Sequence, residues 1–97
     1  MESGANRRSS RRCPCRLPIW LIDEEGALRG EISDLSESGA FVASVRDVRG
    51  AKVELYLRTQ GRPLRVHAEV VHTQSRGIGV HFAPSRDLPY LRDLLPA

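Results

Sequence analysis

The sequence predicts a small all-β domain in which six short strands form an antiparallel barrel and a short C-terminal α-helix follows them. Three observations favour this fold. Apolar residues occur in short runs that alternate with polar residues, which is the period of a half-buried strand. Residues that favour turns separate these runs at the spacing of hairpins. The chain has 97 residues, and an all-β chain of this length protects its strand edges best by closing the sheet.

The first half of the chain predicts three strands, which cover residues 17–22, 27–35 and 40–44. The first, LPIWLI, is apolar on both faces and ends at the acidic turn DEEG, whose glycine favours a reversal. The second strand alternates, with Leu28, Gly30 and Ile32 on one face. The segment SESG then breaks the pattern before the third strand, AFVAS.

The second half predicts three further strands, which cover residues 51–58, 64–73 and 78–82. The first of these alternates cleanly, because Val53, Leu55 and Leu57 point one way while charged and polar residues point the other. The second strand repeats this alternation, and the third, IGVHF, has three apolar residues on one face. The segments TQGRP and SRG are expected to be the turns between these strands.

The tail of the chain changes period and predicts the helix. Leu88, Leu91 and Leu95 fall at positions i, i+3 and i+7, which is the spacing of one helical face. Pro89 fits only the first turn of a helix, because it lacks the N–H group that later turns need. We therefore expect a short helix that begins near residue 88.

Charge divides the chain into two parts. The formal net charge is +3, but residues 1–16 carry five arginines and one glutamate, while the rest of the chain carries ten basic and eleven acidic side chains. The first eleven residues are polar and show no period. We therefore expect a flexible, disordered basic arm over residues 1–11 and a folded domain over residues 12–97.

Several classes of protein do not fit this composition. No apolar run approaches the roughly 18 residues of a membrane-spanning helix, and no apolar segment follows the N-terminal arginines as it would in a secretory signal. A cytoplasmic location without membrane insertion is the expectation. The chain has no Gly-x-Ser-x-Gly, no Walker loop and no convergent pair of acidic residues. The sequence therefore predicts no enzyme and no cofactor.

A metal site is not expected either. Cys13 and Cys15 are separated by one residue, whereas paired zinc ligands are usually separated by two to four residues. The three histidines, His67, His72 and His81, show no ligand-like spacing. We therefore interpret the histidines as surface residues and the two thiols as incidental.

A specific nucleic-acid site is not expected, because duplex binding needs a basic face and the basic charge here lies at one end of the chain. The aromatic residues Trp20, Phe41, Tyr56, Phe82 and Tyr90 are scattered over separate elements, mostly at positions typical of a core. That arrangement does not favour base stacking. Non-specific contact through the basic arm remains an alternative.

Two arginines precede the first strand at a spacing that suits one anionic ligand. Arg12 and Arg16 enclose the segment CPC, and Pro14 disfavours a helix and favours an extended chain. In an extended chain, residues four apart point to the same side and lie about 13 Å apart at ~3.3 Å per residue. Two guanidinium groups at this separation can hold a ligand about one nanometre across.

A second polar motif stands at the end of the second expected strand. Asp34, Ser36 and Gly39 form the pattern D-x-S-x-x-G. Asp34 and Ser36 are two residues apart, so we expect a carboxylate and a hydroxyl to project together from one strand face. Gly39 allows a positive φ or a close backbone approach just beyond them.

In this order the two motifs resemble the PilZ domain, the bacterial receptor module for cyclic di-GMP. The resemblance extends from residue 11 to about residue 95 and includes RLPI after the second arginine, A-x-V at Ala68 and Val70, the strand GIGVHF and the closing helix. It implies a six-stranded barrel of the split-barrel type. It also implies that the two motifs lie on opposite sides of one surface pocket.

The resemblance further implies roles for single residues. Arg12 and Arg16 would engage the phosphates and the guanines of the ligand. Asp34 and Ser36 would read a guanine or its ribose-phosphate, and Gly39 would leave room for the base. The residues expected to bind cyclic di-GMP are Arg11, Arg12, Arg16, Asp34, Ser36 and Gly39.

The arginine motif has an alternative register, because Arg8 and Arg12 also satisfy R-x-x-x-R. We prefer Arg12 and Arg16, since RLPI then leads directly into the first strand as it does in the family. The chain departs from the family at Glu37 and Ser38, where small residues or glycine are common. Glu37 is expected to add a negative charge near an anionic ligand.

The predicted function is a cyclic di-GMP sensor and adaptor in motility or biofilm regulation. We expect the arginine arm to fold over the ligand and to create a surface for an unidentified partner protein. One alternative is a PilZ-fold interaction module that does not bind cyclic di-GMP, and another is a nucleic-acid-binding barrel with a basic arm. The number of bound ligands and the oligomeric state stay open.

Overall fold

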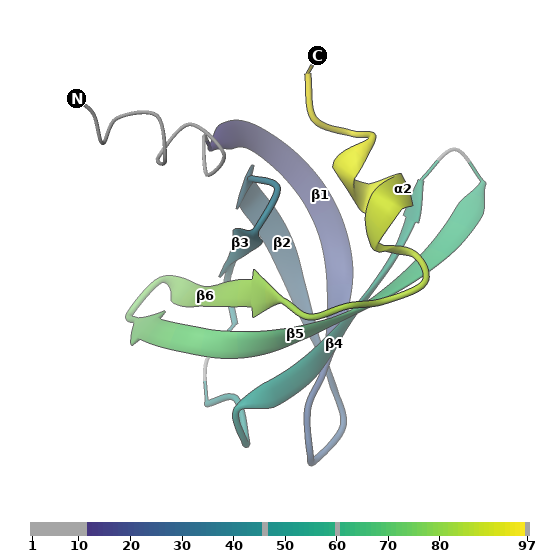
Figure 1. The fold of residues 1–97 in the computed structure, drawn as a ribbon. Helices are drawn as coiled ribbons and strands as arrows, with labels where there is room; N and C mark the ends of the chain where they lie inside the picture. The colour runs from purple at the N-terminus through teal and green to yellow at the C-terminus, as the bar shows by residue number, and fades with distance from the viewer. Residues whose placement is uncertain (1–11, 46, 60, 97) are drawn as a thin grey trace.

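The computed structural model describes residues 12–45, 47–59 and 61–96 (Figure 1). Its elements are, in order, β1 (Cys13–Ile22), β2 (Ala27–Leu35), β3 (Gly39–Ala43), β4 (Lys52–Thr59), β5 (Arg62–Gln74), β6 (Gly77–Phe82) and α2 (Leu88–Arg92). All six expected strands are present, and the helix begins at the expected residue. The expected arm and Arg11 lie outside the described residues. Within the described part, no helix has the length and apolarity to cross a membrane.

Some strand boundaries differ from the expected ones. β1 begins at Cys13 instead of residue 17, so the arginine motif overlaps the strand instead of preceding it. β3 ends at Ala43 because Ser44 has a φ of 69°, a left-handed conformation that does not continue a strand. β5 extends beyond the expected range at both ends.

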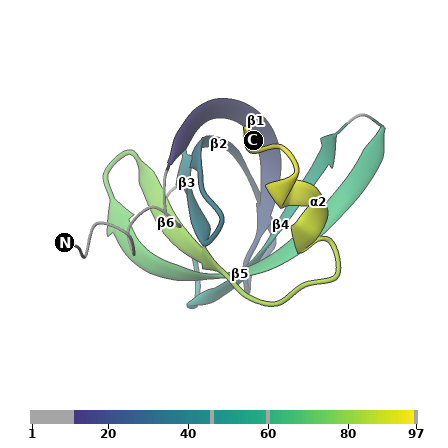
Figure 2. The same cartoon turned by 45° about the horizontal axis from the view of Figure 1, so that its top comes forward.

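The six strands form one closed antiparallel barrel in the order β1-β2-β3-β6-β5-β4, which confirms the predicted fold. The pairing of β1 with β4 is short and covers residues 20–22 of β1 and 54–56 of β4. Residues 13–19 of β1 therefore pair with β2 on one side only. The helix α2 lies at this opening, between β1 and the β4–β5 hairpin (Figures 1 and 2).

The inward side chains of the strands fill the barrel as their alternation predicted. Val53, Leu55 and Leu57 of β4 are all buried. The helix adds Leu88 and Leu91 to the same core, and Leu91 is completely buried. Packing of α2 therefore covers apolar side chains at the end of the barrel where β1 and β4 separate.

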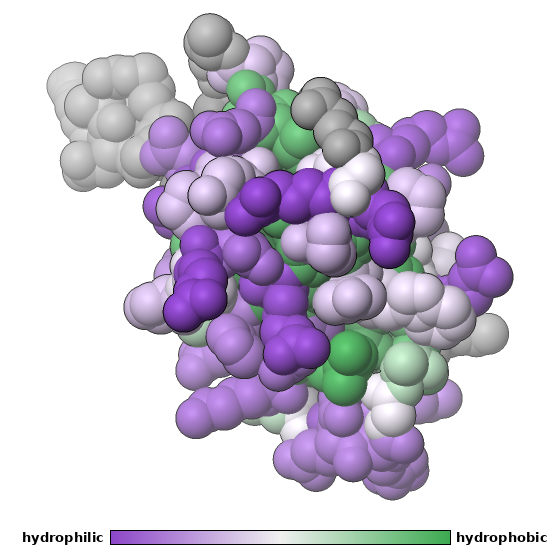
Figure 3. Space-filling view, turned by 90° about the vertical axis from the view of Figure 1, so that its right-hand side faces the viewer, coloured by the Kyte–Doolittle hydropathy of each residue, from purple (hydrophilic) through white to green (hydrophobic). Residues whose placement is uncertain are grey.

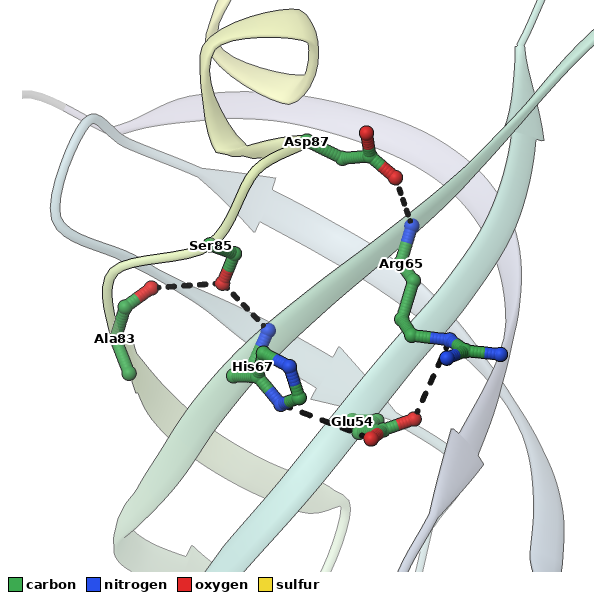
Figure 4. A network of polar contacts seen from close by, with 6 residues as sticks. All are labelled: Glu54, Arg65, His67, Ala83, Ser85 and Asp87. Atoms are coloured by element: carbon green, nitrogen blue, oxygen red, sulfur yellow. Dashed lines mark hydrogen bonds and ion pairs between the residues drawn. The ribbon is translucent and has the colours of Figure 1, made fainter.

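The segment between β6 and α2 is fastened to β5 by its side chains (Figure 4). Only the second half of β5 pairs with β6, so the N–H groups of its first half on that edge need other acceptors. The Asp87 carboxylate accepts the N–H of Arg65 at 2.9 Å. The Ser85 hydroxyl accepts the N–H of His67 at 2.8 Å and donates to the carbonyl of Ala83 at 2.9 Å. Asp87 is the N-cap residue of α2 but makes no side-chain cap; its carboxylate binds the backbone of β5 instead.

Candidate ligand-binding site

A hollow of about 570 Å³ lies on the outer surface of the barrel. Its volume is within the range of roughly 300–1,000 Å³ that is usual for small-molecule sites. It contains Arg12 and Asp34, one residue from each of the two sequence motifs. The side chains that line it are those of Arg12, Ser33, Asp34, Phe41, Ala43, His72, Gln74 and Arg76.

The floor of the hollow is one row of residues that crosses four strands. Asp34 of β2 is paired with Phe41 of β3, Phe41 with Gly79 of β6, and Gly79 with His72 of β5. Neighbouring strands are about 4.8 Å apart, so Asp34 and His72 lie at the ends of a row about 14 Å long. The Phe41 and His72 rings stack across Gly79, with centroids 6.3 Å apart and an interplanar angle of 27°. A side chain at Gly79 would collide with the His72 ring.

A β-bulge turns Asp34 toward this surface. Strict alternation after Leu28, Gly30 and Ile32 would point Asp34 into the core. The register between β2 and β3 shifts between Ile32 and Asp34, which inserts one extra residue in β2. Asp34 consequently lies on the outside, and the next residue, Leu35, is buried in the core.

Ser36 does not project beside Asp34, so that expectation is wrong. Ser36 is 3% exposed. Its hydroxyl accepts the N–H of Gly39 and donates to the carbonyl of the same residue, both at 3.1 Å. The backbone N–H of Ser36 also donates to that carbonyl at 2.9 Å. The hydroxyl therefore fixes the tight turn that joins β2 to β3.

Gly39 is required by a close backbone approach, which is one of the two reasons expected for it. A Cβ atom at Gly39 would collide with the carbonyl of Val80 in β6. Gly39 does not line the hollow. Glu37 is exposed and does not line the hollow either, so its carboxylate is farther from the site than the motif suggested.

Arg12, which directly precedes β1, and Arg16, within β1, are both exposed, but only Arg12 reaches the hollow. The Nε atom of Arg16 is 3.6 Å from Oε2 of Glu31, and the Arg16 side chain is 86% exposed. The β1–β2 register shifts between Pro14 and Leu17, which separates the surroundings of the two arginines. An exposed ion pair contributes only about 0–1 kcal/mol, so Arg16 can leave Glu31 at little cost.

Six lining residues were not predicted from the sequence, namely Ser33, Phe41, Ala43, His72, Gln74 and Arg76. The alternation in AFVAS contained a usable signal, because Ala40 and Val42 are buried and Phe41 between them must point outward. The two glycines of GIGVHF were a second signal, since they leave the outer face of β6 flat. His72 was interpreted only as a surface histidine.

The two cysteines lie near the site as free thiols. The Cys15 thiol donates to the carbonyl of Ile32 at 3.6 Å. Burial, and then the negative charge of Asp34, raise the pKa of the Cys15 thiol, so it stays protonated and poorly nucleophilic at neutral pH. In the part of the chain that the structure describes, no group of three or more His, Cys, Asp and Glu side chains is arranged to hold a metal ion.

The expectation that the aromatic residues lie mostly in the core is wrong. Phe82 is 7% exposed, but Trp20, Tyr56 and Tyr90 are 44%, 38% and 43% exposed. Phe41 is half-buried in the hollow. Trp20 of β1 and Tyr56 of β4 are cross-strand neighbours, whereas Phe41 lies on β3 and Tyr90 on α2.

A closed six-stranded barrel that carries charged and aromatic side chains in an external hollow defines a small binding module. The chain belongs to the PilZ domain family, whose model matches residues 6–95. PilZ domains are receptor modules for cyclic di-GMP and act as binding or adaptor units. The match confirms the resemblance that the two motifs suggested.

Solved structures of PilZ domains have the same fold. The PilZ domain of CeSA from a cellulose-synthesizing bacterium superposes with a TM-score of 0.66 at 23% identity, over 84% of this chain and 89% of that chain. An uncharacterized Legionella protein superposes with a TM-score of 0.62 at 19% identity, over 87% of this chain and 88% of that chain. The Bacillus subtilis inhibitor of motility MotI/DgrA gives 0.60 at 17% identity, over 90% of this chain and 48% of that chain. No curated protein matches the sequence.

Proposed function

We propose that this chain binds cyclic di-GMP in the hollow between Arg12 and His72 and acts as a cytoplasmic adaptor for a partner protein. The observation that carries the proposal is the meeting of Arg12 and Asp34 at one hollow of about 570 Å³. These residues are far apart in the sequence and belong to the two motifs that mark ligand-binding PilZ domains. Family membership supplies the class of ligand.

The charged groups of the hollow complement those of cyclic di-GMP. The ligand has two phosphates and two guanines, and the O6 and N7 acceptors of guanine suit the paired N–H donors of arginine. The N1 and N2 donors of guanine suit the Asp34 carboxylate. Arg76 lines the hollow from the β5–β6 turn, so cations face the ligand from two directions. The stacked rings of Phe41 and His72 offer an aromatic surface for a base.

These contacts suffice for a useful affinity. Hydrogen bonds to charged groups contribute about 1.5–3 kcal/mol each. Three or four of them contribute about 5–12 kcal/mol, a range that includes the roughly 8 kcal/mol of a micromolar complex, and base stacking adds to this before the costs of association and ordering are subtracted. We expect Arg16, and Arg11 of the arm, to add donors when the arm folds over the ligand.

The motif residues divide into two groups in this proposal. Arg12 and Asp34 contact the ligand directly. Ser36 and Gly39 shape the turn that holds the end of β2, and so act on the ligand only through Asp34. This division differs from the sequence expectation, in which all of them faced the ligand.

Titration calorimetry with cyclic di-GMP tests the proposal. We expect micromolar binding to the full chain and a loss of about tenfold to a hundredfold in Asp34→Ala and Arg12→Ala, which corresponds to one charged hydrogen bond each. Arg49→Ala is the matched control, because Arg49 pairs with Glu25 outside the hollow. Binding that survives Asp34→Ala unchanged contradicts the proposed site. Absence of binding to the full chain favours an interaction module that has lost the ligand.

A further inference from the structure

A second row of outward side chains crosses the barrel on strands that the hollow does not use. Arg29 of β2 is paired with Trp20 of β1, Trp20 with Tyr56 of β4, and Tyr56 with Arg65 of β5. Trp20 and Tyr56 are among the exposed large hydrophobic residues of the part that the structure describes. We call these four residues the Trp20 row. It has no residue in common with the hollow.

Each aromatic ring of the Trp20 row has an arginine over it. The guanidinium carbon of Arg29 is 5.3 Å from the centroid of the Trp20 ring, and that of Arg65 is 6.0 Å from the centroid of the Tyr56 ring. Stacking on a ring limits the freedom of a guanidinium and leaves its in-plane N–H donors available. The row therefore presents two partly ordered arginines. Arg29 is ready to bind a carboxylate, whereas Arg65 already has a long, partly exposed ion pair with Glu54, which a partner's carboxylate can replace at little cost.

A groove of about 350 Å³ continues the Trp20 row along β5. Tyr56 and Arg65 line this groove together with Pro63 and Arg86, so the groove and the row form one surface. Seen from the side of α2 and the β4–β5 hairpin, hydrophilic side chains dominate and apolar ones form small separate areas (Figure 3). The groove itself is lined by the charged side chains of Arg65, Arg86 and Asp87 as well as by apolar ones, so charge contributes much of the recognition.

This surface carries more arginine side chains than carboxylates. The Glu54 carboxylate already has two partners: its Oε1 atom is 3.6 Å from Nε of Arg65, and its Oε2 atom is 3.7 Å from Nδ1 of His67. The Asp87 carboxylate accepts the backbone N–H of Arg65. No ion pair joins Arg29 or Arg86 to an acidic side chain among the residues that the structure describes.

We propose that the Trp20 row and its groove bind a short acidic segment of a partner protein. Carboxylates of the segment bind Arg29, Arg65 and Arg86, and its other side chains pack on the exposed parts of Trp20 and Tyr56. The row crosses four strands, about 14 Å, which is the length of about four extended residues. Trp, Tyr and Arg are also the residue types that contribute most to protein interfaces.

A protein partner fits this surface better than single-stranded nucleic acid does. Glu54 and Asp87 lie within the surface and repel a continuous line of phosphates, whereas a peptide can place its few carboxylates only where arginines are. The chain beyond residue 16 carries ten basic and eleven acidic side chains, so it lacks the excess of cations that phosphate tracking needs. The proposal does not depend on cyclic di-GMP binding, because the two sites share no residue.

Fluorescence tests the proposal directly, because Trp20 is the sole tryptophan of the chain. The probe is a synthetic peptide of alternating glutamate and alanine, added to the full chain at low salt, with the lysine analogue and oligothymidylate as comparisons. We expect a saturable change in Trp20 emission with the glutamate peptide alone. Arg29→Glu and Arg65→Glu should each weaken binding at least tenfold, with circular dichroism confirming that both variants are folded.

Arg49→Glu is the matched control, since it makes the same change of charge outside the Trp20 row and its groove. Its affinity for the glutamate peptide should stay within twofold of wild type. Equal losses in Arg49→Glu and Arg29→Glu would show a general effect of net charge and overturn the proposal. Tighter binding of oligothymidylate through the same arginines would assign the surface to nucleic acid. An unchanged Trp20 emission with the glutamate peptide would also refute it.

Discussion

Replacement of Ser36 by alanine separates the structural and the ligand-binding parts of the D-x-S-x-x-G motif. The Ser36 hydroxyl is buried and makes two hydrogen bonds to the backbone of Gly39. Alanine removes the acceptor of the buried Gly39 N–H, and leaving such a group unpaired costs about 1–3 kcal/mol. A loss of about 2 kcal/mol in the free energy of unfolding, the middle of this range, lowers the Tm of a domain of this size by about 8–16 °C.

Asp34→Ala should show the opposite behaviour, because the Asp34 side chain lies at the surface of the hollow. We expect a small change in Tm and a large loss of cyclic di-GMP affinity in this variant. Calorimetric melting of both variants without ligand, followed by titration with cyclic di-GMP below the lower Tm, measures the two effects separately. Ser36→Ala should bind the ligand within about threefold of wild type under these conditions, since its missing hydroxyl does not face the hollow.

Ser38→Ala is the matched control for this experiment. Its hydroxyl is 3.5 Å from that of Ser36, at the limit of a hydrogen bond, so its loss should lower the Tm by much less. A Ser36→Ala variant that has the same Tm as wild type but no longer binds cyclic di-GMP would contradict this prediction. That result would mean that the Ser36 hydroxyl leaves the turn to contact the ligand.

Three further predictions follow from the packing and the charges. Gly79→Ala should displace the His72 ring, and calorimetric titration should show weaker cyclic di-GMP binding. Leu91→Ala should destabilise the domain by about 2–5 kcal/mol in urea unfolding, because Leu91 is completely buried; a smaller loss would mean that α2 does not complete the core. Backbone N–H groups, first that of Arg49, lower the pKa of Asp23. Because the pKa of Asp23 is lower in the folded chain than in the unfolded chain, where it is about 3.9, the ionised carboxylate stabilises the fold at any pH above that value. This stabilisation is lost as the pH falls through the pKa of the folded chain. Asp23→Asn should therefore lower the Tm at pH 7, and the difference from wild type should disappear in acid; a difference that is constant with pH would contradict this.

The inward faces of the strands were predictable from the sequence because their alternation is regular. Val53, Leu55 and Leu57 are buried as expected, and α2 begins where Pro89 required it to begin. These features depend on local periodicity, which a single sequence displays directly. Closure of the barrel followed from the length of the chain and the need to protect strand edges.

The geometry of the site was less predictable, because it depends on β-bulges and on strand neighbours. The sequence analysis expected Asp34 at a surface pocket, but a bulge adds one residue without changing composition, so the alternation did not show how Asp34 turns outward while Ile32 and Leu35 stay inside. The neighbours of Asp34 across the hollow come from β3, the hairpin partner of β2, and from β5, which only the barrel order brings to the same surface. His72 could therefore not be predicted as a site residue from the sequence, because only the strand register shows that it lies beside Gly79.

The part of β1 that has no β4 partner has a consequence for behaviour at high concentration. An unpaired strand edge is a template on which another chain can add a strand, and repeated addition leads to aggregation. Pro14 and Pro18 lie in this stretch and lack the N–H donors that an incoming strand would use, and the charged Arg16 stands between them. The same short stretch that directly follows Arg12 of the hollow thus also discourages chains from pairing edge to edge.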